Sequence, residues 1–168
     1  MSDTRTKDPK WPVCPWDTEP DEDHFEHAGL QCAIYRHERS GHLCGYVQVP
    51  EGHPLHGKDY GDQVPESLRA LLDDALKGPI GKRNLVSILC ANLDDGGRID
   101  LLIDVHGGLT FSGKLRGAAG YWFGFDCAHA GDYSPYRGRW MDDETYRDIE
   151  YVRTECRRLA EQLAAMQS

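Results

Sequence analysis

The sequence predicts an α+β protein, in which a mainly antiparallel sheet carries a long C-terminal helix packed on one face. Apolar residues between Tyr146 and Met166 recur every three or four positions, which is the spacing of one buried helix stripe. Several short runs elsewhere are rich in the β-branched and aromatic residues that strands favour. Along the chain, the predicted order is strand, strand, helix, strand, strand, strand and helix.

The strand predictions rest on short apolar runs bounded by turn residues. Residues 38–42 join the first two runs as a hairpin loop, and Asp94-Asp95-Gly96-Gly97 is a strong turn signal between the third and the fourth. The third run is also consistent with a short buried helix, because its periodicity does not separate the two. The five runs are residues 31–37, 43–49, 85–93, 98–105 and 120–129.

Two helices are expected, and both have recognisable ends. The first covers residues 65–77, since Pro65 suits a first turn and Gly78-Pro79 stops the helix. The second is the long C-terminal helix, whose start carries Asp142 and Asp143, where acidic groups favour the helix dipole.

The length of 168 residues suits a single domain. Residues 1–28 are predicted to be a flexible tail. They hold four prolines, an acidic run at residues 19–23 and few apolar side chains to offset the entropy of ordering. Residues 29–168 are predicted to form one α+β domain without internal repeats.

The composition excludes several classes of function. The chain has 19 Lys and Arg against 28 Asp and Glu, whereas proteins that bind bulk nucleic acid or anionic membranes present basic surfaces. No apolar run approaches the roughly 20 residues of a membrane span, and residues 1–10 lack the apolar core of a signal peptide. The six cysteines form no CxxC pair and have no secretory context for disulfides. We therefore expect a cytoplasmic protein.

The candidate site lies in the glycine-rich part of the chain, since ten of the 18 glycines fall between residues 96 and 138. If residues 104–110 and 124–132 form neighbouring strands, side-chain alternation brings Asp104, His106, Cys127 and His129 to one patch. Carboxylate, imidazole and thiolate are ligands of a zinc-type site, so we expect a divalent metal such as zinc, manganese or iron.

The residue roles follow from this set. We predict His106, Cys127 and His129 as metal ligands, with catalytic roles for Asp104 or Asp132 as a further ligand or a general base. Two other interpretations stay open. Cys127 could be a nucleophile activated by His106 or His129, or the whole set could cap turns and fill the core.

Ligand-binding roles are predicted for residues around this set. Gly107 and Gly108 would let the backbone approach a ligand closely. Lys58 lies in a polar loop, residues 51–60, that could close over the site and contact an anion, or could be plain surface. Trp122 belongs to an aromatic run that could stack on a base, although such a run also suits a sheet core.

Several motifs occur together in a fixed order: residues 42–47, 52–60, 105–110, 122–132 and 146–152. They include His106-Gly107-Gly108-Leu109-Thr110 and the run from Gly124 to Asp132. In this combination the chain resembles a family of small uncharacterised proteins encoded mainly by bacteriophages and prophages, over residues 42–60 and 100–165. The resemblance implies a phage or prophage origin and the cytoplasm of a bacterial host, and it brings no known reaction with it.

Together these observations predict a small metal-assisted hydrolase of a phosphorylated or nucleotide-like small molecule, in which the metal lowers the pKa of bound water. The rival interpretation is a non-enzymatic protein that binds and sequesters a small ligand, such as a host defence nucleotide signal. A third is an acidic inhibitor that occupies the surface of a host protein, which the net charge of −9 motivates. Trp140 and Tyr136 could seed a dimer, and a monomer is equally consistent.

Overall fold

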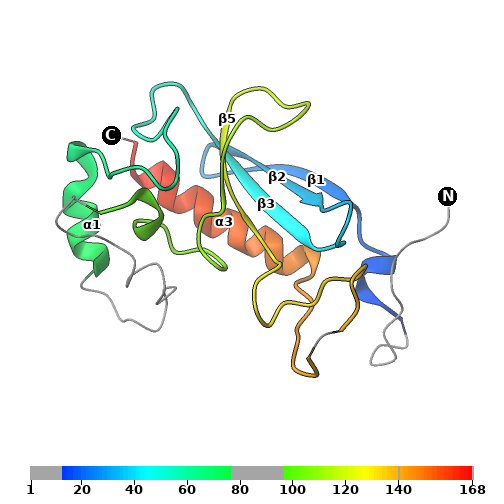
Figure 1. Cartoon of the computed structure of the whole chain (residues 1–168). Helices are drawn as coiled ribbons and strands as arrows, with labels where there is room; N and C mark the ends of the chain where they lie inside the picture. The colour runs from blue at the N-terminus through cyan, green and yellow to red at the C-terminus, as the bar shows by residue number, and fades with distance from the viewer. Residues whose placement is uncertain (1–12, 77–96, 140, 168) are drawn as a thin grey trace.

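The protein has an α+β fold, as the sequence predicts, built from a five-stranded antiparallel sheet and a C-terminal helix (Figure 1). The computed structural model describes residues 13–76, 97–139 and 141–167. The strand order is β1-β2-β3-β5-β4, so the last strand in the chain lies inside the sheet rather than at its edge. The strands are β1 (Glu22–His27), β2 (Leu30–Arg36), β3 (Leu43–Val49), β4 (Phe111–Gly113) and β5 (Tyr121–Asp126).

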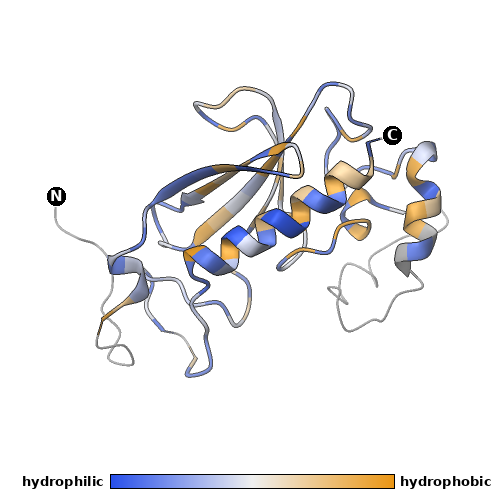
Figure 2. Ribbon diagram, turned by 180° about the vertical axis from the view of Figure 1, so that it is seen from behind, coloured by the Kyte–Doolittle hydropathy of each residue, from blue (hydrophilic) through white to orange (hydrophobic). Residues whose placement is uncertain are grey.

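The helix α3 (Ile149–Ala165) covers one face of the sheet, as the view from behind shows (Figure 2). The register aligns Cys32 of β2 with Val47 of β3 and Val47 with Phe123 of β5, and all three side chains join the core beneath α3. The helix contributes its own buried stripe, which includes Val152 and Leu159. Alternation along the strands therefore fixes which side chains are left on the opposite face.

The opposite face of the sheet carries polar and aromatic side chains. Tyr46 of β3 pairs with Gly124 of β5, and Gly124 pairs with Phe111 of β4. One step along the sheet, Cys44 pairs with Asp126. Among the described residues, no helix lies over this face (Figure 1).

The N-terminal segment corrects the prediction of a flexible tail over residues 1–28. Residues 15–17 form a short 3-10 helix, η1 (Pro15–Asp17), and residues 22–27 form the edge strand β1. Trp16 is fully buried, stacked on Tyr133 and edge-on to Tyr146. The acidic run that argued for disorder instead supplies ion-pair partners, since buried Arg36 binds Glu19 and Asp21. Residues 1–12 lie outside the described part of the chain.

Of the remaining predicted elements, one is confirmed, one is wrong and one lies outside the described residues. The first helix is confirmed as η2 (Glu66–Leu68) followed by α1 (Arg69–Leu76). The strand predicted over residues 98–105 is wrong, because this stretch forms the 3-10 helix η5 (Ile99–Leu101) and then a turn. Its apolar side chains fill the core without pairing as a strand. The run at residues 85–93 lies outside the described residues.

The C-terminal helix begins later than its apolar stripe suggests. Asp148 caps it, with the side chain accepting a hydrogen bond from the backbone N–H of Tyr151, so Ile149 is its first residue. Tyr146 lies before the helix and belongs to the small cluster around Trp16. In the described residues, no helix is long and apolar enough to span a membrane.

The contact between α3 and β3 makes a testable prediction at Gly45. A Cβ atom on Gly45 would lie 2.6 Å from the Cys156 sulfur and from the ring of Phe125. Gly45→Ala should therefore lower the free energy of unfolding by about 1–3 kcal/mol in urea denaturation, since it overpacks the core. Gly52→Ala is the matched control, because Gly52 is exposed with nothing within 4 Å of its Cβ position. Equal stability of the two variants would contradict this close packing.

Candidate functional site

The candidate site is built around the buried carboxylate of Asp132, whose side chain is 1% exposed. Its Oδ2 lies 2.7 Å from Nε2 of His106 and accepts the backbone N–H of His129 at 3.0 Å. Its Oδ1 accepts a hydrogen bond from Nε of Arg147 at 2.9 Å. Burial by itself raises the pKa of Asp132, but the hydrogen bonds from His106 and Arg147 outweigh it and lower the pKa. The carboxylate is therefore ionised at neutral pH.

Backbone pairing brings the partners of Asp132 together. The chain leaves β5 at Asp126 and turns at Gly131, which has a φ of +91°. The N–H of Thr145 then binds the carbonyl of Gly131 at 2.7 Å, and the N–H of Tyr133 binds the carbonyl of Thr145 at 2.9 Å. This short parallel bridge places Arg147, two residues further on, beside Asp132.

His106 uses both ring nitrogens inside the protein. Because Asp132 is ionised, Nε2 carries a hydrogen and donates a hydrogen bond to the carboxylate. Nδ1 lies 2.7 Å from the hydroxyl of Tyr151 on α3. Burial raises the pKa of the Tyr151 hydroxyl, which is therefore neutral at pH 7 and also lies 3.4 Å from Oε1 of Glu155, to which it donates. His106 thus links the turn after η5 to the helix and to the segment after β5.

His129 lies beside this network with one nitrogen uncommitted. Its ring centroid is 5.8 Å from that of His106, at an interplanar angle of 64°. Its Nε2 is buried and has no hydrogen-bond partner among the described residues, although the carboxylate of Asp126 lies 3.5 Å away. Asp126 is itself held in place, since it accepts hydrogen bonds from the Thr110 hydroxyl at 2.9 Å and from the backbone of Ala128 at 3.0 Å.

The first of two hollows beside His129 lies over the open face of the sheet, and we call it the sheet hollow. Its volume is about 490 Å³. Tyr46 and Phe111 meet edge to face in its lining, with ring centroids 5.3 Å apart. Its polar lining side chains are His37, His42, Thr110, Asp126 and His129.

Two histidines at one end of the sheet hollow are held together by a serine. The rings of His37 and His42 stack with centroids 4.8 Å apart, and Nδ1 of each lies within 2.9 Å of the Ser40 hydroxyl. Burial lowers the pKa of His42 to about 4, with a smaller contribution from the neighbouring His37. His42 is therefore a neutral imidazole at pH 7.

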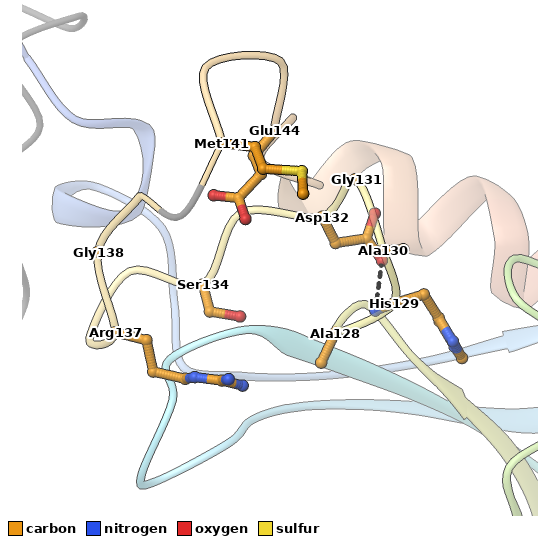
Figure 3. Close-up of a pocket in the computed structure, with 10 residues that line it drawn as sticks. All are labelled: Ala128, His129, Ala130, Gly131, Asp132, Ser134, Arg137, Gly138, Met141 and Glu144. Carbon is orange, nitrogen blue, oxygen red and sulfur yellow. Dashed lines mark hydrogen bonds between the residues drawn. The ribbon is translucent and has the colours of Figure 1, made fainter.

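The second hollow is enclosed by the loop after β5, and we call it the loop hollow (Figure 3). Its volume is about 230 Å³, and it shares Ala128 and His129 with the sheet hollow. The side chains of Ser134 and Arg137 point into it from one side, and those of Met141 and Glu144 lie across from them (Figure 3). His129 therefore stands at the junction of the two hollows.

The predicted metal ligands are only partly brought together. His106 and His129 are neighbours, but both nitrogens of His106 are engaged by Asp132 and Tyr151. Cys127 is 2% exposed within the core, and burial raises the pKa of its thiol, which disfavours the thiolate that a metal or a nucleophilic step needs. Among residues 13–76, 97–139 and 141–167, no group of three His, Cys, Asp or Glu side chains is arranged to hold a metal. In this arrangement His106 is engaged through both nitrogens and Cys127 is buried as a thiol, so the metal site stays a prediction.

Asp104 does not join Asp132. Its carboxylate binds Arg158 of α3 at 2.6 Å, and its backbone N–H and carbonyl bind the amide of Gln162. Asp104 therefore fastens the chain after η5 to α3. Through side chains of that helix Asp104 is linked to the site, because Arg158 also binds Glu155, which accepts a hydrogen bond from Tyr151.

The predicted ligand-binding residues do not all lie at the candidate site. Gly107 lies directly against the ring of His129, whereas nothing lies within 4 Å of a Cβ position on Gly108. Trp122 is 5% exposed and donates its indole N–H to the carbonyl of Ala119, so it offers no stacking surface. Lys58 lines neither hollow, and its carbonyl accepts a hydrogen bond from Tyr121.

Sequence reasoning missed the residues that β3 and the loop after β5 contribute. Tyr46 and His42 become part of the site only because β3 pairs with β5, which follows it by more than 70 residues. Even-numbered residues of β3 share one face, so this set is recognisable once the pairing is known. Arg137 lies in none of the motifs noted in the sequence, and Arg147 lies in the motif at residues 146–152, which assigns it no role.

Comparison of the sequence with models of known families and with curated proteins, and of the structure with solved structures, finds no match for this chain. The fold and the site define a small α+β protein in which a buried histidine–aspartate network supports two adjoining surface hollows.

The seating of His129 against Gly107 gives a prediction with an internal control. A Cβ atom on Gly107 would lie 2.1 Å from Nε2 of His129, whereas a Cβ on Gly108 meets nothing. Both glycines have positive φ, +66° and +81°, so the backbone strain of an alanine is similar at the two positions. Gly107→Ala should shift the imidazole NMR signals of His129, assigned with His129→Gln, while Gly108→Ala leaves them in place. Equal shifts in the two variants would contradict the contact.

Proposed function

We propose that this protein binds a small phosphorylated molecule in the loop hollow, with His129 contacting the phosphate group. The single observation that carries the proposal is the place of His129 at the junction of the two hollows, with a buried nitrogen that has no hydrogen-bond partner among the described residues. A ligand oxygen that binds that nitrogen breaks no existing hydrogen bond, but the ring has to turn away from Gly107, against which Nε2 is buried.

Arg137 supplies a positive charge to the lining of the loop hollow, which also carries Asp132 and Glu144. Arg137 and the Ser134 hydroxyl both point inward there (Figure 3), and guanidinium and hydroxyl groups are suitable donors to phosphate oxygens. The carboxylate of Asp132 is compensated by Arg147 and by its hydrogen bond with His106. Glu144, on the other side of the hollow, would orient the ligand by repelling its phosphate towards Arg137.

Binding without turnover is the form of the proposal that the hydrogen-bond pattern favours. The strongest acid–base pair of the site, His106 with Asp132, is committed internally and lines neither hollow as a pair. A protein that holds a phosphorylated ligand in this way can sequester it. The resemblance to bacteriophage proteins supports a host nucleotide signal in the bacterial cytoplasm as the class of ligand.

Hydrolysis is the second candidate, and the pair of His129 with Asp126 favours it. In that reaction Nε2 of His129 takes a proton from a water molecule as the water oxygen attacks phosphorus. The bond from phosphorus to the ester oxygen breaks, and the leaving oxygen takes up a proton. Asp126, 3.5 Å from Nε2, would stabilise the imidazolium that forms.

The test is calorimetric titration with ribose 5-phosphate and with inorganic phosphate. Wild-type protein should bind ribose 5-phosphate, and Arg137→Gln should weaken binding about tenfold or more, because a hydrogen bond to a charged group contributes about 1.5–3 kcal/mol. Arg116→Gln is the matched control, since Arg116 is an exposed arginine on the loop between β4 and β5. Absence of binding, or equal binding by the two variants, would overturn the proposal.

The same samples separate binding from hydrolysis. Ribose 5-phosphate recovered unchanged after long incubation identifies a binder. Release of inorganic phosphate by the wild type, lost in His129→Gln with the melting temperature retained, identifies the hydrolase.

A further inference from the structure

We propose that the sheet hollow is a binding site for a planar heterocycle that carries an amino group, such as an adenine-type base. This inference rests on the proposed function, which places the phosphate of the same ligand in the loop hollow. Together the two hollows would then take the two ends of one nucleotide.

The sheet hollow has the size and the lining of a small-molecule site. Its volume of about 490 Å³ falls within the few hundred to about 1,000 Å³ typical of ligand pockets. Such pockets combine aromatic walls with a small number of fixed polar groups. Here Tyr46 and Phe111 supply the aromatic walls, and the polar groups come from the ends of β3 and β5 and from residues beside them.

The aromatic walls are held in a defined geometry. The ring of Tyr46 lies over Gly124, where a Cβ atom would be 2.3 Å from the tyrosine ring. Phe111 meets Tyr46 at 87°, so the two rings form a corner rather than a stack. A flat ligand ring can therefore stack on one wall and present its edge to the other.

The polar groups at the rim select for hydrogen-bond donors on the ligand. Asp126 is 30% exposed, and each of its oxygens already accepts one hydrogen bond, from Thr110 or from Ala128. A carboxylate oxygen can accept more than one hydrogen bond, so Asp126 is fixed in place and still able to accept from an amino group. His42, as a neutral imidazole at one end of the hollow, adds no competing positive charge at pH 7.

The two hollows meet at the right place for one ligand. Ala128 and His129 line both of them, so a base in the sheet hollow and a phosphate in the loop hollow lie on either side of the same two residues. Neither group would have to enter the core beneath α3.

The experiment titrates full-length protein with adenosine, purine riboside, ribose 5-phosphate and adenosine 5′-monophosphate. Adenosine should bind, and purine riboside, which lacks the amino group, should bind at least fivefold more weakly. Adenosine 5′-monophosphate should bind more tightly than either adenosine or ribose 5-phosphate. Binding of ribose 5-phosphate with none of adenosine overturns this inference and leaves the proposed function standing. Binding of adenosine with none of ribose 5-phosphate overturns the proposed function and leaves the sheet hollow as the site of the base.

A pair of variants localises the base. Phe111→Ala should weaken adenosine binding at least fivefold, since stacking of a base on an aromatic side chain is worth that much or more. Phe25→Ala is the control, because Phe25 is a half-buried phenylalanine of β1 on the α3 side of the sheet. In wild-type protein, adenosine should also shift the ring NMR signals of Tyr46. Unchanged Tyr46 signals on saturation, or equal loss of binding in the two variants, would place the base elsewhere.

Discussion

The arrangement of the site depends on one buried charge, the carboxylate of Asp132. A carboxylate that is 1% exposed is stable in its ionised form only when it is paired and hydrogen-bonded, and Asp132 has three donors: His106, Arg147 and the N–H of His129. These donors come from the turn after η5, the segment before α3 and the turn after β5. The carboxylate therefore ties its own turn to two other stretches of chain, at His106 and Arg147, which are 26 and 15 residues away in the sequence.

This network explains why the reactive side chains of the chain play different roles. His106 is enclosed between Asp132 and Tyr151 and acts as a link between the turn after η5 and α3. His129 is fixed through its backbone by Asp132 and through its ring by Gly107, against which Nε2 lies, and the residue lines both hollows. The internal hydrogen bonds of the network thus make a rigid support, and ligand contacts fall to the groups around it. A site pre-organised in this way loses little conformational entropy on binding.

The fold class, the first helix and the strands expected at residues 31–37, 43–49 and 120–129 could be predicted from periodicity, although the last of these strands ends at Asp126. The N-terminal segment could not, because its order comes from long-range partners: Trp16 stacks on Tyr133, and Arg36 neutralises its acidic run. The glycine-rich segments pointed to His106 and His129 as neighbours and to Asp132 just beyond, although residues 104–110 do not form the strand on which that prediction rested. The roles of these three residues depend on Tyr151 and Arg147, which both lie in the motif at residues 146–152 but reach the site only through the tertiary fold.

The pH dependence of stability in wild-type protein and in Asp132→Asn tests this account most directly. The folded-state pKa of Asp132 is lowered, so its charge stabilises the fold above the unfolded pKa of about 3.9, and this contribution is lost as the pH falls through the folded value. Urea denaturation should show the variant less stable by about 3 kcal/mol at pH 7, with the difference shrinking below about pH 4, where the carboxyl of the unfolded chain takes up a proton before that of the folded protein. Equal stability at pH 7, or a difference as large at pH 3 as at pH 7, would contradict the central role of this carboxylate.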